Sequence, residues 1–267
     1  MRFHKWAKNA ALTAALLAGS AGSAEAANLV SYRAIYDVRL SEARSGSAVT
    51  AASGQIAYGT KENCDSWIIN QTGAMFLQTS EGDVLPQPLN FSAWESQDGT
   101  QYRFSVMGED ADATILGGAK KQGEAGAAEF SKPQSLRFDL PKGTLFPMVH
   151  TDHIINQAQK GVMQFQNYVF EGTDVEGAKL LVTFVSPLSS LAESFTKSLS
   201  DTALTRPGWN FRLAYFNPED QASIPMYEIE ADYLDNGVPV RWVLDYGDFS
   251  VEMGLSKFET LPAPECS

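Results

Sequence analysis

Most of this chain consists of short stretches in which apolar and polar residues alternate, with Gly, Asp, Asn or Pro between one stretch and the next. In residues 29–40, for example, Tyr32, Ala34 and Tyr36 fall on one face and Arg33 on the other. Alternation with a period of two is typical of a strand with one buried face. About a dozen or more such stretches predict an antiparallel all-β protein, either an open or closed barrel or a sandwich.

Turn signals between these stretches predict where the hairpins lie. The Asp-Gly pair at residues 98–99 is the strongest of them. Residues 41–53 are small and polar, and we expect a turn there. Residues 117–129 are rich in Gly, Ala, Lys and Glu, and we expect a mobile hairpin tip between strands at 112–117 and 127–140.

One stretch predicts a helix, from Pro147 to about Gln159. Proline suits the first helical position, because its missing N–H would be unpaired there anyway, and Gly161 is placed to end the helix. The helix has a broad apolar face, made of Met148, Val149, Ile154, Ile155 and Ala158. One apolar helix among many strands predicts a sheet wrapped around a helix. Residues 188–200 fit either a short helix or a loop.

The chain starts with a predicted secretory signal peptide, residues 1–26. It has a basic start, a short apolar run and the cleavage sequence Ala24-Glu25-Ala26. The apolar run is shorter than the roughly 20 residues that a membrane span needs. We therefore expect cleavage after Ala26, a single domain at residues 27–267 without an integral membrane segment, and location in the periplasm.

The net charge limits the kinds of partner. The whole chain carries a formal charge of −12, from 20 Lys and Arg and 32 Asp and Glu. Cleavage removes three basic residues and one acidic residue, which leaves 17 and 31 and a net charge of −14. Such a chain repels nucleic acid and anionic membranes. We therefore expect no nucleic acid partner, and a neutral, apolar or basic one instead.

The two cysteines, Cys64 and Cys266, lie near opposite ends of the expected mature chain. An even number of cysteines in an exported protein suggests one disulfide. The alternative is a pair of free thiols, one of them a redox site. That alternative lacks both a C-x-x-C spacing and a nearby basic residue to stabilise a thiolate.

Signals for catalysis are weak. His150 and His153 are three residues apart on one face of the predicted helix. A zinc site needs a third protein ligand, and the usual helical pair is four residues apart. The sequence contains no G-x-S-x-G elbow and no glycine-rich nucleotide motif. We expect a protein without a metal or cofactor and without enzymatic activity.

Several blocks together resemble a known family. They are residues 30–40 (VSYRAIYDVRL), 64–71 (CDSWIINQ), 141–151 (PKGTLFPMVHT) and 233–249 (YLDNGVPVRWVLDYGDF), followed by Cys266. The combination, which extends over essentially all of residues 27–267, resembles the cell-envelope integrity protein EipB family of alphaproteobacterial periplasmic proteins. The resemblance implies a spiral, incompletely closed β-barrel of about fourteen antiparallel strands with one internal helix. It also implies a disulfide between Cys64 and Cys266, a role in envelope homeostasis, and no established catalytic activity.

These inferences lead to three functional hypotheses. The first is a non-enzymatic periplasmic protein that binds a protein or peptide partner, since an open edge strand can accept an added strand. The predicted helix would form the floor of the binding surface, through His150, His153 and Ile154. The second is a lipid or lipoprotein carrier, which needs a continuous apolar cavity. The third, less favoured, is an envelope hydrolase.

Overall fold

The structure, a computed structural model, describes residues 27–108, 113–219 and 224–266. The predicted signal peptide, residues 1–26, lies outside these ranges. The strands form one fourteen-stranded sheet in which neighbouring strands are antiparallel. In chain order they are β1 (Tyr32–Ala43), β2 (Val49–Glu62), β3 (Ser66–Thr79), β4 (Val84–Ser96), β5 (Gln101–Val106), β6 (Ile115–Gln122), β7 (Ala125–Lys132), β8 (Leu136–Leu140), β9 (Gln164–Val169), β10 (Lys179–Pro187), β11 (Gly208–Phe216), β12 (Tyr227–Leu234), β13 (Pro239–Asp245) and β14 (Phe249–Thr260).

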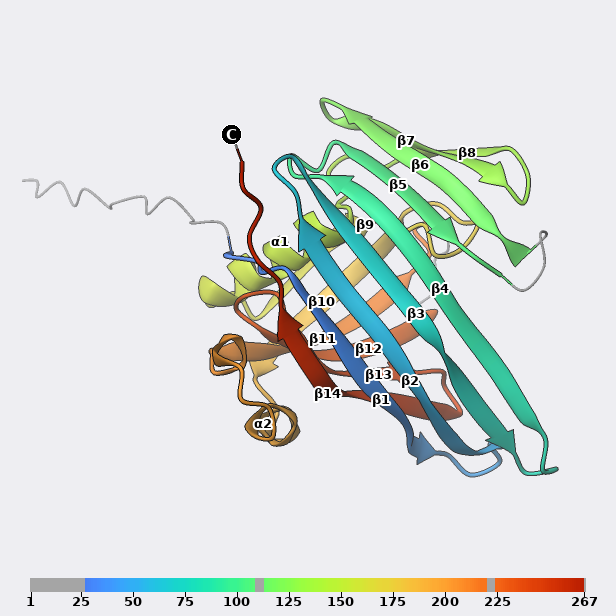
Figure 1. Ribbon diagram of the computed structural model, residues 1–267. Coiled ribbons are helices and arrows are strands. Elements are labelled where there is room, and N and C mark those ends of the chain that lie inside the picture. The colour runs from blue at the N-terminus through green and yellow to red at the C-terminus, as the bar shows by residue number, and fades with distance from the viewer. Residues whose placement is uncertain (1–26, 109–112, 220–223, 267) are drawn as a thin grey trace, which may run out of the picture.

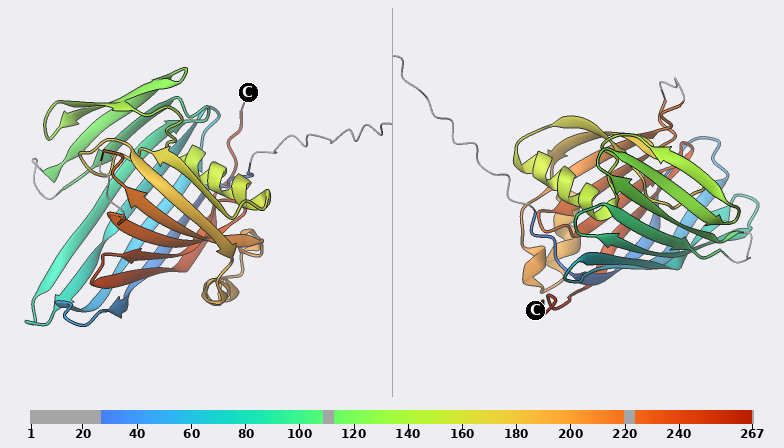
Figure 2. Two further views of the ribbon diagram at one scale, coloured as in Figure 1. Left: turned by 180° about the vertical axis from the view of Figure 1, so that it is seen from behind. Right: turned by 90° about the horizontal axis from the view of Figure 1, so that it is seen from above.

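The sheet is a spiral that does not close. Its order runs from β8 back to β1, continues to β14 and ends at β9, so β8 and β9 are the two edges. Helix α1 (Pro147–Gln159) connects these edge strands along the chain. Figures 1 and 2 show the sheet curled around α1, with the long strands β1–β4 crossing β10–β13. The predicted open barrel of about fourteen strands with an internal helix is confirmed.

The helix has the predicted bounds. Pro147 is its first residue, and Gly161 follows its end with a φ of +75°, a conformation that glycine adopts without strain. The buried positions are Met148, His150, Ile154, Ile155 and Ala158. The predicted apolar face is wrong at one position. Val149 is only half-buried, and the neighbouring His150 is buried instead.

The predicted turn at residues 41–53 is too long. Strand β1 extends to Ala43 and β2 begins at Val49, so only residues 44–48 connect them. The small residues in this stretch pair with β3 and β1 in long ladders. Local composition suggested a loop here, but the backbone pairing of long neighbouring strands overrides that preference.

The predicted mobile tip at residues 117–129 is also wrong. These residues form most of β6 and β7, with a turn only at residues 123–124, and the expected strand at 127–140 divides into β7 and β8. The glycines here make room for packing. A Cβ on Gly117 would lie 2.4 Å from Cζ of Phe104, so a larger residue would collide with an interior ring.

That interior is filled with aromatic rings beside the N-terminal part of α1. The cluster contains Tyr102, Phe104, Phe130, Phe146 and Phe170. Neighbouring rings have centroids 5.2 to 6.5 Å apart, in stacked and edge-on arrangements that stabilise aromatic pairs. The first part of α1 therefore rests on a packed core.

The ambiguous residues 188–200 form a short helix, α2 (Ser190–Lys197), capped by the hydroxyl of Ser189. It lies outside the spiral, against β13 and β14, where Phe195 packs on Gly254. A 3₁₀ turn, η2 (Thr202–Leu204), follows. In the part of the chain that the structure describes, no helix is long and apolar enough to cross a membrane.

Candidate functional site

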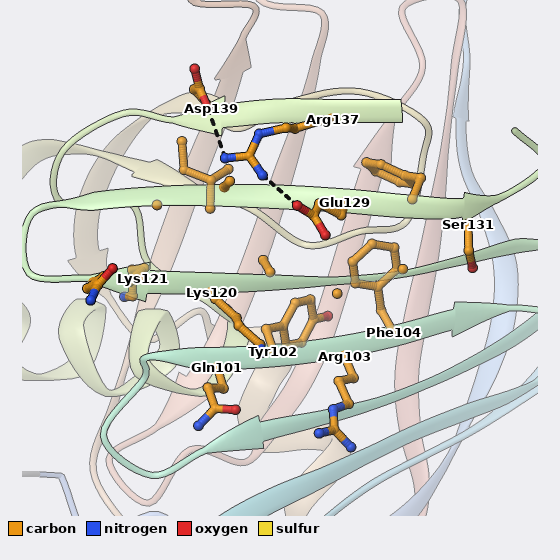
Figure 3. A pocket seen from close by; sticks show the side chains of 18 of the residues that line it. Gln101, Tyr102, Arg103, Phe104, Lys120, Lys121, Glu129, Ser131, Arg137 and Asp139 are labelled. Atoms are coloured by element: carbon orange, nitrogen blue, oxygen red, sulfur yellow. Dashed lines mark hydrogen bonds and ion pairs between the residues drawn. The ribbon is translucent and has the colours of Figure 1, made fainter. Parts of the chain in front are cut away.

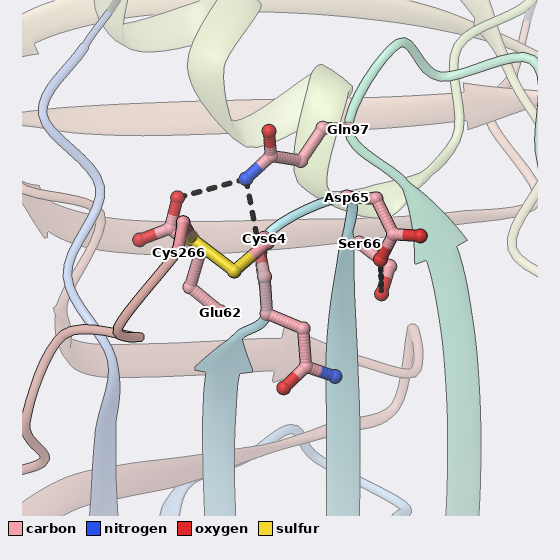
Figure 4. Close-up of a disulfide and its surroundings, with 7 residues drawn as sticks. Glu62, Cys64, Asp65, Ser66, Gln97 and Cys266 are labelled. Atoms are coloured by element: carbon pink, nitrogen blue, oxygen red, sulfur yellow. Dashed lines mark hydrogen bonds between the residues drawn. A yellow bond between two sulfur atoms is a disulfide. The ribbon is translucent and has the colours of Figure 1, made fainter.

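The predicted disulfide is present. Cys64 and Cys266 are bonded across a sequence separation of 202 residues, with their Cα atoms 5.5 Å apart. The bond ties the C-terminal segment to the connection between β2 and β3, which excludes the alternative of two free thiols. Gln97 holds the same connection, because its Nε2 donates to Oε1 of Glu62 at 2.8 Å and to the carbonyl of Asn63 at 3.2 Å (Figure 4).

A carboxylate from the sheet caps the start of α1. The two oxygens of Glu95, on β4, accept hydrogen bonds from the backbone N–H groups of Met148 at 2.7 Å and Val149 at 3.0 Å. The residue at the N-cap position, Phe146, makes no side-chain cap, so Glu95 satisfies donors that a helix start leaves unpaired. Glu95 is fully buried. Burial raises its pKa to about 7, although the two N–H donors and Lys121 lower it.

A cation lies near the same helix start. Nζ of Lys121 donates to the carbonyl of Thr144 at 3.0 Å and lies 4.6 Å from the ring centroid of Phe146. Burial lowers the pKa of this lysine. Sequence reasoning missed both charged residues. The available signal was the alternation in β4, which places Glu95 on the same face as the buried Ala93.

The three residues predicted to form a binding floor lie on α1, but they do not form an exposed surface. His150 and Ile154 are buried, while His153 is half-buried and its ring meets Phe165 edge-on, with 5.4 Å between centroids. Burial lowers the pKa of His150 to about 3, and its Nε2 has no hydrogen-bond partner among the described residues. A role of these residues in binding stays a prediction. No group of three or more His, Cys, Asp or Glu in the described ranges could hold a metal.

The β9 edge of the spiral exposes backbone groups that could pair with another strand. Alternate residues of an antiparallel strand point their N–H and C=O groups to opposite sides. The N–H of Val185 donates to the carbonyl of Met163 at 2.9 Å, so odd-numbered residues of β9 face β10. The N–H of Leu145 donates to the carbonyl of Tyr168 at 2.8 Å, so even-numbered residues face the open side.

Among the described residues, Leu145 is the one whose backbone pairs with that open side. Leu145 forms a single parallel bridge with Val169, at the end of β9. Further along the strand, Gln164 and Gln166 are exposed, and their backbone groups make no hydrogen bond within the described parts of the chain. The edge therefore offers two consecutive outward-facing residues for pairing.

The other open stretches are protected. The first half of β4 extends beyond β5, whose pairing with β4 covers only residues 91–95. The N–H of Met107 donates to the carbonyl of Asn90, so the even-numbered positions of β4 face this open side. Two of them are Pro86 and Pro88, which have no N–H to offer to an added strand.

The last edge, β8, is guarded differently. It has only five residues, and two of them, Arg137 and Asp139, are exposed charged residues. Short edge strands and charged side chains both discourage the addition of another strand. The open part of β9 has neither proline nor charge.

A hollow of about 1200 Å³ lies over β5 to β8 (Figure 3). Small residues line its floor, among them Gly118 and Ala127. Arg137 pairs with Glu129 on one side, and Arg103 lies 5.3 Å from the ring centroid of Trp94 on the other. The rim mixes both signs of charge, so its chemistry does not select one class of ligand.

Comparison with known proteins supports the fold and the family. A sequence profile described as EipB-like matches residues 23–262. The chain is 29% identical over 251 residues to the cell envelope integrity protein EipB of Brucella abortus (strain 2308), covering 91% of this chain and 88% of that protein. A crystal structure of a β-barrel-like protein of a domain of unknown function, also from Brucella abortus, superimposes with a TM-score of 0.79. That match has 24% sequence identity and covers 89% of this chain and 100% of the other.

Proposed function

The chain belongs to the EipB-like family, and we propose that it maintains the cell envelope from the periplasm by binding a protein or peptide partner, without catalysing a reaction. The similarity to a cell envelope integrity protein supports the envelope role. The Cys64–Cys266 disulfide supports an oxidising compartment.

The observation that carries the proposed binding mode is the contrast between the edges. Two prolines guard the open half of β4, whereas the outward-facing Gln164 and Gln166 of β9 keep their N–H donors. Natural sheets usually block an exposed edge because it invites pairing with other chains. An unblocked edge in a sheet whose other open stretches are blocked supports its use for strand addition.

The surroundings of this edge favour a partner with apolar side chains. On the face of the sheet that carries the side chains of Gln164 and Gln166, the facing positions of β10 are Phe184 and Val182. Phe184 is 45% exposed, and the nearby Met163 is 57% exposed, which is high for large apolar residues. An added strand would lie next to Met163 and would be separated from Phe184 by β9.

The lipid carrier hypothesis has less support. A carrier needs an apolar cavity that an acyl chain can enter. Beside the start of α1, that space contains packed aromatic rings, including Tyr102, Phe146 and Phe170. Native mass spectrometry tests this alternative, because a carrier would retain co-purified lipid.

Photo-crosslinking in intact cells tests strand addition. A benzophenone side chain at position 166 should capture a specific envelope protein, and the same group at Asn70, an exposed position on β3, should not. Gln166→Pro should abolish the crosslink formed from position 164 and reproduce the envelope sensitivity of a strain without the gene. Gln166→Ala, which keeps the N–H, should do neither.

Proline at position 166 should leave the fold intact, because the internal ladder to β10 uses the odd-numbered residues. The expected loss in unfolding free energy is below about 1 kcal/mol. Full function of Gln166→Pro would rule out strand addition at β9.

A further inference from the structure

The first residue after the predicted cleavage site is bound to the internal helix. The backbone nitrogen of Ala27 donates to Oδ1 of Asp152 at 2.7 Å. Asp152 lies on α1, and its Oδ2 accepts a hydrogen bond from Nδ2 of Asn156 at 2.8 Å, which orients the carboxylate. The bond therefore joins a carboxylate of the helix to the backbone nitrogen of a residue 125 positions earlier in the chain.

We propose that Ala27 is the N-terminal residue of the exported protein and that its ammonium forms an ion pair with Asp152, which anchors the start of the chain to α1. The inference is independent of the proposed partner binding. A leader peptidase would hydrolyse the Ala26–Ala27 peptide bond with water, leaving a carboxylate on Ala26 and a free amine on Ala27. At neutral pH most of that amine is protonated.

Hydrogen bonds of the residues that follow hold Ala27 in place, so the new charge has little freedom to move away. Its carbonyl accepts a hydrogen bond from the N–H of Leu29 at 2.8 Å, and Val30 donates to the carbonyl of Asn236 at 3.1 Å. Ala27 and Leu29 both pack against the apolar cluster beneath the second half of α1.

The environment favours an ion pair over a neutral hydrogen bond. Ala27 and Asp152 are both half-buried, so solvent screens the pair less than it screens a surface pair. The other titratable groups of α1 are His150 and His153, and His153 interacts electrostatically with Asp152 and with Lys160, which follows the helix. A charge-assisted bond is roughly twice as strong as a neutral one.

If Ala27 and Asp152 form this ion pair, the fold is completed only after export. Both ends of the chain would be fixed after export, the start by hydrolysis before Ala27 and the end by the disulfide between Cys64 and Cys266. The first anchors the segment before β1 to α1, and the second anchors the segment after β14 to the β2–β3 connection. Since β1 and β14 pair with each other, both anchors hold the centre of the spiral sheet.

The test uses the full-length protein, exported with its own leader and purified. Mass spectrometry should give a chain that begins at Ala27. Four proteins then form a cycle, namely the native protein, Asp152→Asn, a variant with one glycine inserted between Ala26 and Ala27, and the combination. The inserted glycine moves the ammonium away but keeps the N–H of Ala27.

Asp152→Asn should lower the melting temperature by about 3 °C in the native background and by less than about 1 °C after the glycine insertion. An equal loss in both backgrounds would mean that Asp152 binds only an amide, and a mature chain that begins elsewhere would also overturn the proposal. Because asparagine has nearly the same shape as aspartate, failure to fold is not expected in any of the four.

Discussion

The buried cap on α1 makes the pH dependence of stability a direct test of how the helix is held. We consider Glu95→Gln, which keeps the shape and one acceptor oxygen but removes the titratable group. In the folded protein the pKa of Glu95 is raised from 4.5 to about 7, chiefly by burial. A carboxyl group with a raised pKa favours the folded state when protonated, so its contribution is full below pH 4.5 and is lost as the pH rises through 7.

The expected size follows from these two values. Between about pH 5 and about pH 8, the linkage relation gives a loss of roughly 2.5 kcal/mol of unfolding free energy from Glu95 alone. The stability of the wild type relative to Glu95→Gln should therefore be about 2.5 kcal/mol greater at pH 5 than at pH 8.

A second buried group on the helix acts in the opposite direction. The pKa of His150 falls from 6.5 to about 3 in the folded protein. Its contribution to stability is present above pH 6.5 and is lost as the pH falls towards 3. From about pH 8 to about pH 5, that loss is roughly 2 kcal/mol. The two effects nearly cancel in the wild type, so Glu95→Gln should become clearly less stable in acid.

Urea denaturation at several pH values, followed by tryptophan fluorescence, measures these differences. Glu42→Gln is the matched control, because Glu42 is exposed near the end of β1. Its effect should stay within about 0.5 kcal/mol at every pH. If the wild type minus Glu95→Gln difference did not change with pH, Glu95 would not titrate as a buried cap, and the reasoning would be wrong.

Three further substitutions test other parts of the fold. Cys64→Ser should lower the unfolding free energy by up to roughly 5 kcal/mol, because the disulfide closes a long loop and limits the entropy of the unfolded chain. Reductant should destabilise only the wild type, and an equal response of both proteins would contradict a stabilising role of the disulfide. Gly117→Val should cost about 2 kcal/mol by calorimetry, because the added side chain meets Phe104; an unchanged melting temperature would show that the ring moves aside. Arg241→Leu should cost about 4 kcal/mol in urea, since the buried carboxylates of Asp232 and Glu252 lose the guanidinium that lies between them. A neutral result would mean that their other partners, Ser189 and Arg39, are sufficient.

Much of the fold could be predicted from local patterns. The alternation of apolar and polar residues predicted strands, and the Asp-Gly pair marked the β4–β5 turn. Pro147 and Gly161 marked both ends of α1, because a proline start and a glycine end depend only on backbone geometry near those residues. The cysteine pairing could be anticipated because the chain contains two cysteines only.

The errors occurred where packing decides. Residues 117–129 have the composition of a loop, yet they form strands, since Gly117 gives room to an aromatic ring from β5. The predicted apolar face of α1 included Val149, which is only half-buried, whereas His150 is buried. Which side of a helix faces the core depends on what surrounds it, and one sequence does not contain that information locally.

By itself, then, the sequence determined the strand-rich class, the bounds of α1, the expected cleavage after Ala26 and the cysteine pair, because each depends on neighbouring residues or on composition. Only the tertiary structure decided that Glu95 caps a helix 53 positions away, that Asp152 meets Ala27, and that β9 keeps an unguarded edge while prolines guard the open half of β4. These features bring together residues far apart in the chain, and local preferences along the sequence do not specify such contacts.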